Sequence, residues 1–461
     1  MSDTRKLSAY NYIRDFELDN SILADISQRL LSDINKGLSR HGHENSSVKC
    51  FQTYVQDFPT GEETGRYLAL DLGGTNFRVL MISLGNAKKF HMEKKTYEFP
   101  NDLKKGTAEK MFDYVAECVN DFLNHLRTKM EVNELFPLGF TFSFPVQQMG
   151  LNVGIMMKWT KGFNVSGVVG KDVVQLLRES FQRKKIHDHL TPVAILNDTT
   201  GTLMSCAWNK PDTRVGLIVG TGTNACYTEK IENIEFFDGD PAKPYMIVNT
   251  EWGNFGSDGR LNDILTEYDR NLDSYSSHVN EQIYEKLISG RYLGELMRLI
   301  IVKMINDEHL FQGKYAEQFS TRFSLKTEFL SKIERDCPEK YGETKKQLKE
   351  IGVENCCLED LKNLRVIAEA LSTRSAALVS AGVATILNKM AVTPVTVGVD
   401  GSLYRYHPKY KEIMQEKIRC LTDSRIEFQL MLSEDGSGRG AALVAAVLVC
   451  NQAPRDIDNQ L

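Results

Sequence analysis

Short turns rich in glycine and threonine carry the first residues of this sequence that could do chemistry. The stretch DLGGTN begins at Asp71 and stands between two apolar runs, RYLAL and FRVLMISL. Gly73 and Gly74 can adopt positive φ, so this turn can bring bare backbone N–H groups up to a ligand. Polar donors and a cation follow at Thr75, Asn76 and Arg78. This combination suits a phosphate group, although an ordinary hairpin turn also uses Gly and Asn.

A second turn repeats this chemistry in the next part of the chain. The stretch VGLIVGTGTNACYTEKI begins at Val215, and it offers hydroxyl groups at Thr221 and Thr223. When the two Thr-Asn pairs are superposed, Gly74 falls on Gly222. The repeat predicts one hairpin at the opening of each half of a duplicated domain, although so few matched positions could also coincide by chance.

Two glycine-rich stretches fit the relaxed dinucleotide pattern G-x-G-x-x-A, but neither has the setting that the pattern requires. After Ala225 comes CYTEKI, a strand pattern where a helix is needed, and Gly436 falls almost at the end of the chain. No G-x-x-x-x-G-K-[ST] occurs, which excludes the P-loop class. The stretch SEDGSGRGAALVAA remains suited to a nucleotide, because a helix N-terminus presents N–H groups and a positive dipole end.

Further polar residues stand where predicted strands end. The apolar run from Val193 to Leu196 leads directly to Asn197 and Asp198, and SFPVQQ, KWTKGF and NTEWGNFG are similar endings. Open α/β sheets bind ligands outside the carboxyl ends of their strands. Each such residue alone could cap a turn, and Asp198 could serve as a helix N-cap. Together they favour a neutral ligand rich in hydroxyl groups, bound by amides and acceptors at Asn197, Asn224, Glu251 and Glu285.

The apolar periodicity predicts the elements that must position these residues. Apolar residues recur every four positions from Ile22 to Leu38, which is typical of a helix. Strand and helix patterns then alternate, as in an α/β protein with some parallel pairing. The predicted elements are helices at 108–126 and 173–181, strands from Leu138 and Val193, a charged helical segment at 261–362, and a last α/β stretch between Val395 and Cys450.

Composition restricts the class of protein. A chain of 461 residues is too long for one compact core, so two or three domains are expected. A net charge of -5 argues against a general nucleic-acid binder. The nine cysteines include no C-x-x-C pair, which favours reduced thiols in the cytoplasm, and no metal-ligand spacing occurs. The N-terminus has no signal-peptide core, and no apolar run is long enough to span a membrane.

Eight motifs occur in a fixed order: LALDLGGTNFRV, LGFTFSFP, KWTKGF, NDTTGT, LIVGTGTNACY, NTEWGNFG, VGVDGSLYR and LSEDGSGRGAAL. From about Phe51 to Val449 the chain closely resembles the eukaryotic hexokinase family, at the size of a single unit. The resemblance implies an actin-like ATPase fold, with two ribonuclease-H-like lobes around a cleft. It also implies ATP-dependent phosphorylation of a hexose at its 6-hydroxyl, with Mg²⁺, as the first step of glycolysis. Glucose is the expected hexose, with fructose and mannose as further substrates.

The resemblance assigns roles to individual residues. Asp198 matches the catalytic base, and Lys161 is the candidate to steady charge on the transferred phosphoryl group. The residues expected to contact the sugar are Ser143, Phe144, Thr160, Lys161, Asn197, Asp198, Asn224, Glu251, Gln282 and Glu285. Those expected to contact the nucleotide are Asp71, Gly73, Gly74, Thr75, Asn76, Arg78, Thr221, Gly222, Gly436 and Ser437. No direct metal ligand is expected, and Asp71 would reach Mg²⁺ through water.

The resemblance also implies a domain organisation. A helical segment at 1–59 would pack mainly on the large lobe at 198–440, which carries sugar-binding residues, the second phosphate loop and the adenosine segment. The small lobe would comprise 60–197, joined by the C-terminal helix at 441–461. Sugar binding is expected to close the lobes and expel water, with hinges near Gly201 and at 436–440.

Other interpretations of the same sequence stay open. A catalytically silent sugar sensor would keep the pocket, but the intact Asp198 and Lys161 argue against it. An actin- or chaperone-like ATPase would have no use for the sugar-site motifs. The N-terminus lacks the apolar leader with which some hexokinases dock on mitochondria, so organelle docking is not expected. The sequence predicts no nucleic-acid partner, and it allows either a monomer or a homodimer.

Overall fold

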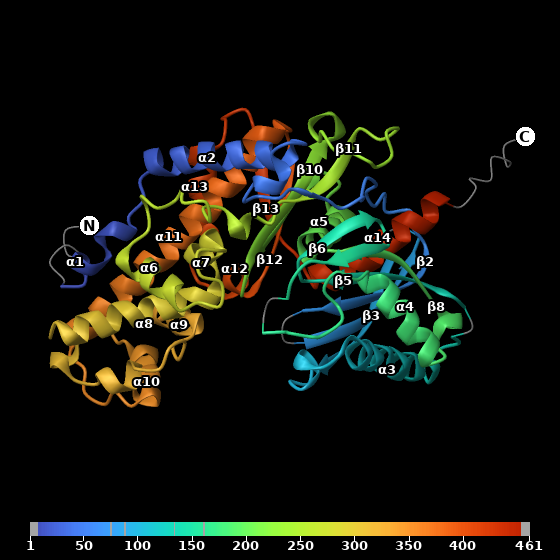
Figure 1. Cartoon of the computed structure of the whole chain (residues 1–461). Coiled ribbons are helices and arrows are strands. Elements are labelled where there is room, and N and C mark those ends of the chain that lie inside the picture. The colour runs from blue at the N-terminus through green and yellow to red at the C-terminus, as the bar shows by residue number, and fades with distance from the viewer. Residues whose placement is uncertain (1–7, 74–75, 87–88, 133, 160–161, 453–461) are drawn as a thin grey trace, which may run out of the picture.

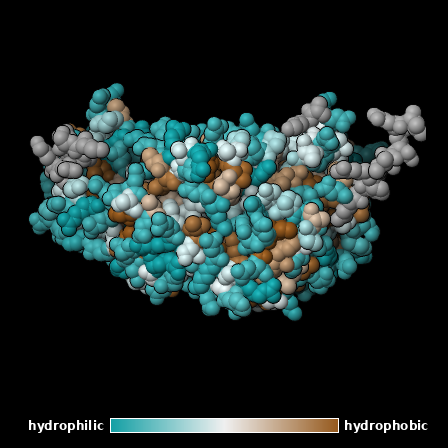
Figure 2. Space-filling view, turned by 90° about the horizontal axis from the view of Figure 1, so that it is seen from above, coloured by the Kyte–Doolittle hydropathy of each residue, from teal (hydrophilic) through white to brown (hydrophobic). Residues whose placement is uncertain are grey.

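The computed structural model describes residues 8–73, 76–86, 89–132, 134–159 and 162–452, and two β-sheets organise them. Figure 1 shows the sheets in separate halves of the molecule, with most of the helices grouped around the larger one. The face seen in Figure 2 is mostly hydrophilic, with apolar residues showing between the polar ones. The two halves are called the six-stranded half and the five-stranded half below.

The five-stranded sheet begins with a hairpin that contains the first glycine turn. Its strands are β2 (Gly65–Leu72), β3 (Asn76–Gly85), β4 (Lys89–Glu98), β5 (Phe136–Phe142) and β8 (Leu190–Leu196). They lie in the order β4-β3-β2-β5-β8, and β2, β5 and β8 run parallel. Alternate residues of β2 face two different cores: Leu68, Leu70 and Leu72 point to one, and Tyr67 and Ala69 to the other. This strand is therefore buried on both faces.

Helices cover both faces of the five-stranded sheet. The helices α3 (Ala108–Arg127) and α4 (Val173–Arg183) supply the core on one face, and α14 (Gly436–Gln452) lies on the other. A Cβ atom on Gly139 of β5 would lie 2.1 Å from the carbonyl oxygen of Ala441, so only glycine allows α14 to approach this closely. The C-terminal helix is thereby fixed against the strands that end at the first glycine turn.

The six-stranded sheet repeats the same plan. Its strands are β1 (Phe51–Gln52), β9 (Thr213–Val219), β10 (Thr223–Lys230), β11 (Tyr245–Asn249), β12 (Val395–Asp400) and β13 (Phe428–Leu432). The order β11-β10-β9-β12-β13, with β1 added outside β11, again joins an antiparallel hairpin to two parallel strands. The duplication predicted from the two glycine turns is confirmed by this shared strand order.

The remaining helices surround the six-stranded sheet. They are α1 (Tyr10–Ile13), α2 (Asn20–Leu38), α6 (Glu267–Ser274), α7 (Ile283–Ile288), α8 (Gly290–Asn306), α9 (Thr327–Arg335), α10 (Gly342–Ile351), α11 (Leu358–Met390), α12 (Ser402–Tyr406) and α13 (Tyr410–Leu421). A small hairpin of β6 (Val146–Gly150) and β7 (Val153–Met156) belongs to neither large sheet. By length and composition α11 could cross a membrane, but 89% of its most apolar window is buried inside the protein, as in the core helix of a large domain.

Helix α5 (Asp198–Asn209) crosses α14 where the two halves meet. A Cβ atom on Gly440 would lie 1.9 Å from the carbonyl oxygen of Gly201, so the two backbones touch. Both glycines were hinge candidates, and the structure places them at this helix crossing. The hinge itself and the domain boundaries at residues 59, 197 and 440 stay predictions.

Candidate active site

A cavity of about 920 Å³ is lined by residues of both halves. It gathers residues that lie far apart in the sequence, at strand ends and in the turns that follow them. The predicted site residues in its lining are Asp71, Gly73, Arg78, Ser143, Phe144, Asn197, Asp198, Thr221, Gly222, Asn224, Glu251, Gln282, Glu285 and Ser437. Sugar-site and nucleotide-site predictions therefore fall in one continuous space.

Some predicted residues cannot be placed in this cavity. Gly74, Thr75, Thr160 and Lys161 lie outside the described residues. Asn76 begins β3, and its side chain is also outside the described part. Gly436 is not part of the cavity lining, but its N–H donates to Asp400 Oδ2 at 3.2 Å, and Asp400 does line the cavity.

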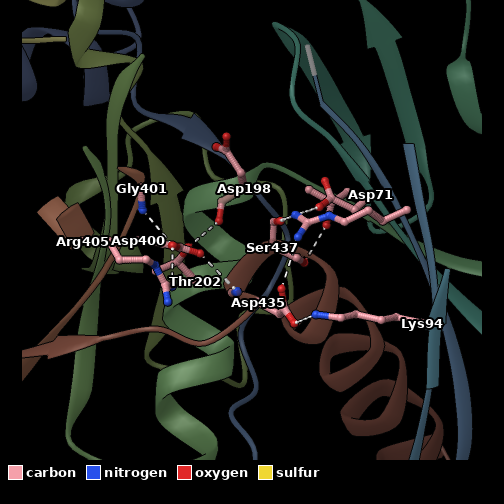
Figure 3. Close-up of polar contacts among 12 residues, drawn as sticks. Asp71, Lys94, Asp198, Thr202, Asp400, Gly401, Arg405, Asp435 and Ser437 are labelled. Carbon is pink, nitrogen blue, oxygen red and sulfur yellow. Dashed lines mark hydrogen bonds and ion pairs between the residues drawn. The ribbon is translucent and has the colours of Figure 1, made fainter. Parts of the chain in front are cut away.

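Asp198 is the first residue of α5, and only Asn197 separates it from the end of β8. The helix is capped by Asn197, whose side-chain oxygen accepts from the Thr199 N–H at 2.9 Å. The alternative that Asp198 is the N-cap is therefore wrong. In Figure 3 the Asp198 carboxylate points away from Asp400 and from its neighbours Gly401 and Arg405. The Asp198 carboxylate therefore stands at the N-terminus of α5 and lines the cavity.

An amide cluster lies beside Asp198. The Asn224 side-chain amide donates to Asn249 Oδ1 at 2.8 Å and to Glu251 Oε1 at 3.1 Å. It also lies 3.4 Å from Asn197 Oδ1, and the Asn249 amide donates to Glu251 Oε1 at 2.8 Å. These contacts fix the rotamers of carboxamides and a carboxylate that share one wall. Such groups match the donors and acceptors of sugar hydroxyls.

Two residues that line the cavity, Glu251 and Gln282, have an unusual backbone conformation. Glu251 and Gln282 both have positive φ, 50° and 55°, which non-glycine residues adopt rarely. The Gln282 N–H donates to Asn254 Oδ1 at 3.1 Å, which ties the two segments together. Glu285 Oε2 accepts from the Thr223 N–H at 3.2 Å, so this carboxylate also supports the second glycine turn. Backbone strain held by surrounding contacts is common where a ligand must be oriented.

At the other end of the cavity, the buried Asp71 forms an ion pair with the partly exposed Arg78. Arg78 also donates to Ser437 Oγ at 3.0 Å and reaches Asp435 at 3.3 Å. Burial opposes the charge of Arg78, but Asp71 and Asp435 outweigh this effect and raise the pKa of the guanidinium. Lys94 lies 2.5 Å from the other oxygen of Asp435. Two cations thus stand near the first glycine turn, where a phosphate would need them.

A second cavity, of about 820 Å³, shares Thr221, Arg291 and Ser402 with the first. Its walls come from α9, α12 and the segment before α9. Apolar and cationic side chains both contribute to it: Phe323, Leu325, Leu403, Tyr406, Lys326, Lys332 and Arg335. The shared residues make it an extension of the first cavity beyond the second glycine turn.

Sequence reasoning missed several residues that line these cavities or support them. Asn249 and Asp400 stand within the motifs NTEWGNFG and VGVDGSLYR, so their motif positions were a usable signal. Lys94 and Arg291 carried no such signal, because nothing near them in sequence indicates a ligand. Only the fold brings these two cations to the cavity.

Comparisons with known proteins find similarity to hexokinases over most of the chain. Two sequence profiles described as hexokinase match residues 8–208 and 214–447. Human hexokinase-1 is 42% identical over 440 residues, which is 94% of this chain and 47% of the relative. Rat hexokinase-2 is 41% identical over 443 residues, again with 94% and 47% coverage. The chain therefore spans about half the length of the curated relatives it matches.

Two solved hexokinase structures match this chain over nearly their whole length. A hexokinase from Schistosoma mansoni, complexed with glucose, is 40% identical, covers 95% of this chain and 98% of its own, and superposes with a TM-score of 0.87. Another hexokinase structure is 31% identical with the same coverage and a TM-score of 0.81. The predicted fold, an actin-like ATPase fold of two α/β lobes around a cleft, is confirmed by these matches. This chain belongs to the hexokinase family.

Proposed function

We propose that this chain transfers the γ-phosphoryl group of ATP to the 6-hydroxyl of a hexose, with glucose preferred and fructose and mannose as further substrates. The observation that carries the proposal is the shared cavity. It combines a wall of amides and carboxylates with residues of two glycine turns and the partly exposed cations Arg78 and Lys94. A hydroxyl-rich ligand and a polyphosphate would each find suitable partners there, side by side.

Asp198 is the general base in this proposal. The sugar hydroxyl is a weak nucleophile, so a carboxylate within hydrogen-bond reach must take its proton as the bond to phosphorus forms. The proton passes to an oxygen of the Asp198 carboxylate, which lies at the first position of α5. Such catalysis contributes about 10²–10⁴ in rate, roughly 3–5 kcal/mol. Lys161 would stabilise charge on the transferred group and orient the sugar.

The first glycine turn and Arg78 would hold the nucleotide phosphates. Among the described residues no cluster of His, Cys, Asp or Glu is arranged to bind a metal ion alone. A single buried carboxylate, Asp71, stands beside the turn, and it already accepts from Arg78 and Ser437. This donor set fits Mg²⁺ held mainly by phosphates and water, with Asp71 binding a coordinated water. When bound, the ion would neutralise charge on the β- and γ-phosphates.

The second cavity would hold the adenosine part of ATP. It begins at Thr221, next to the proposed phosphate site, and its apolar side chains suit a planar base. Gly436 and Ser437, which the sequence also predicted to contact the nucleotide, lie at the start of α14. In this arrangement Ser437 contacts the phosphate end through Asp71 and Arg78.

Lobe closure would exclude water from the transfer. Water is a competing acceptor small enough for any cavity, so a site assembled only with sugar bound prevents ATP hydrolysis. The crossing of α5 and α14 at Gly201 and Gly440 is the proposed pivot. Small-angle scattering with and without glucose tests closure, and an unchanged radius of gyration would exclude it. The proposed location of the protein is the cytoplasm. Both a monomer and a homodimer are compatible with the proposed function.

A coupled assay for ADP formation tests the activity. ADP released only when glucose is added supports the proposal. Glucose binding without ADP indicates a sugar sensor, and ADP released at the same rate without sugar indicates a general ATPase. Steady-state kinetics with glucose, fructose and mannose, with and without the phosphorylated product, then define substrate preference and product inhibition.

A further inference from the structure

An ion pair joins the two halves of the molecule at the rim of the large cavity. Lys158 Nζ lies 2.9 Å from Glu281 Oε2, and the two side chains are 44% and 50% exposed. Lys158 follows β7, on the side of the five-stranded half, and Glu281 precedes α7 in the six-stranded half. Their chain neighbours Trp159 and Gln282 line the cavity. The pair therefore spans the opening between two walls of the proposed sugar site.

The backbone of Glu281 is held firmly from within its own half. Lys286 donates to the carbonyl oxygens of His278 and Glu281 at 2.6 and 2.8 Å, and it pairs with Asp273. The Lys286 side chain is only 5% exposed, so these contacts lie inside the protein. Glu281 is also flanked by two residues with positive φ, Asn280 and Gln282. The carboxylate is thus presented at a fixed place on the rim.

Lys158 is anchored through the next residue. The Trp159 indole N–H donates to the Val165 carbonyl oxygen at 2.9 Å. Its ring stacks on Phe163 with centroids 5.5 Å apart and meets the edge of Phe144 at 5.0 Å. Side chains of most exposed ion pairs must be ordered when they meet, which removes much of the gain. Here other contacts hold both backbone segments, so forming the pair has to order the two side chains alone.

We propose that Lys158 and Glu281 are positioning residues that form an electrostatic latch across the rim of the sugar cavity. The latch holds the two walls together and slows the release of a bound hexose. The latch depends on the proposed function in one respect, which is that the bound ligand is a hexose. The latch leaves the phosphoryl transfer itself unchanged, because neither side chain belongs to the cavity lining.

Charge reversal tests the latch in the full chain. Glucose affinity is measured by calorimetry, with kcat from the coupled assay, for the wild type, Lys158→Glu, Glu281→Lys and the double variant. Each single reversal places like charges across the rim, and we expect the Kd for glucose to rise about three- to tenfold with little change in kcat. The double variant restores opposite charges, so its Kd should return to within about twofold of the wild type.

Lys95→Glu is the matched control. Lys95 pairs with Asp121 at 2.6 Å with exposures of 43% and 52%, but both residues belong to the five-stranded half. Its reversal should leave the Kd for glucose unchanged. The loss of glucose affinity in each single variant should also become smaller at about 1 M salt, where exposed charges are screened within about 3 Å.

The outcomes separate this proposal from the proposed function. A wild type that binds glucose, with single reversals that bind equally well or more tightly, overturns the latch alone. A double variant as weak as the single variants also overturns it, because a lost side chain and not the pairing would then explain the effect. A wild type that binds no hexose overturns both proposals.

Discussion

The Ser437 hydroxyl donates a 2.7 Å hydrogen bond to Asp71 Oδ2, although the two residues lie 366 positions apart in the chain. Asp71 is in β2, next to the first glycine turn, and Ser437 is in the first turn of α14. Arg78 contacts both side chains, so the three form one partly buried cluster. The C-terminal helix thereby supports the phosphate end of the cavity.

Replacing Ser437 with alanine should weaken this support. Asp71 would keep its pairing with Arg78 but lose one hydrogen bond, at a cost of about 1 kcal/mol in the free energy of unfolding. The KM for ATP should rise more than the KM for glucose. Chemical denaturation and steady-state kinetics measure both effects. Ser320→Ala, which removes an exposed local hydrogen bond, should change neither.

Asp198→Ala and Asp198→Asn should remove most turnover. Without a proton acceptor, kcat should fall by about 10²–10⁴, whereas the Kd for glucose should stay within a few-fold. Rapid kinetics and calorimetry separate the two quantities. Asp188→Asn is the control, because that side chain is 83% exposed beside His187. Near-normal turnover in either Asp198 variant would remove this residue from the mechanism.

Thr221→Val should weaken ATP more than sugar. Thr221 lines both cavities, and valine keeps its shape while removing the hydroxyl that would contact a phosphate. The KM for ATP should rise several-fold with the KM for glucose almost unchanged. Thr191→Val, at an exposed position of β8, is the matched control. A larger effect on glucose would contradict the assignment of this turn.

Gly440→Ala should destabilise the crossing of α5 and α14. The added Cβ would lie 1.9 Å from the Gly201 carbonyl oxygen, so the helices must separate. Overpacking of this kind costs about 1–3 kcal/mol, and a clash with backbone lies at the upper end. Denaturant unfolding measures the loss. Gly342→Ala is the control, because nothing lies within 4 Å of its added Cβ at the start of α10, and it should not destabilise.

The exposed and the buried cysteines should differ in reactivity. Cys337, Cys357 and Cys420 are exposed. Burial raises the pKa of Cys226 to about 12 and that of Cys206 to about 11, so both stay protonated thiols at neutral pH. A thiol reagent should label the exposed three quickly in the native protein and the buried thiols only after unfolding. Mass spectrometry of labelled peptides identifies the sites, and fast native labelling of Cys226 would contradict this burial.

Local patterns in the sequence predicted the elements that depend on neighbouring residues. The helix at 108–126 is α3, the helix at 173–181 is α4, and both glycine turns join paired strands, β2 to β3 and β9 to β10. Several elements were missed, and for α11 and β4 the reason is physical. Helix α11 is buried on almost every side, so its apolar residues show no helical period, and β4 is a polar strand at a sheet edge.

The sequence by itself determined the residue types of the site, because glycine turns and strand-end carboxylates are local features. It could not decide that Asn197 and not Asp198 caps α5, since either side chain can accept from the helix N–H groups. The tertiary structure alone brought Lys94 to Asp435, Ser437 to Asp71 and Lys158 to Glu281. These pairs depend on how the two sheets pack through α5 and α14, and nothing in the sequence near either partner encodes that distance.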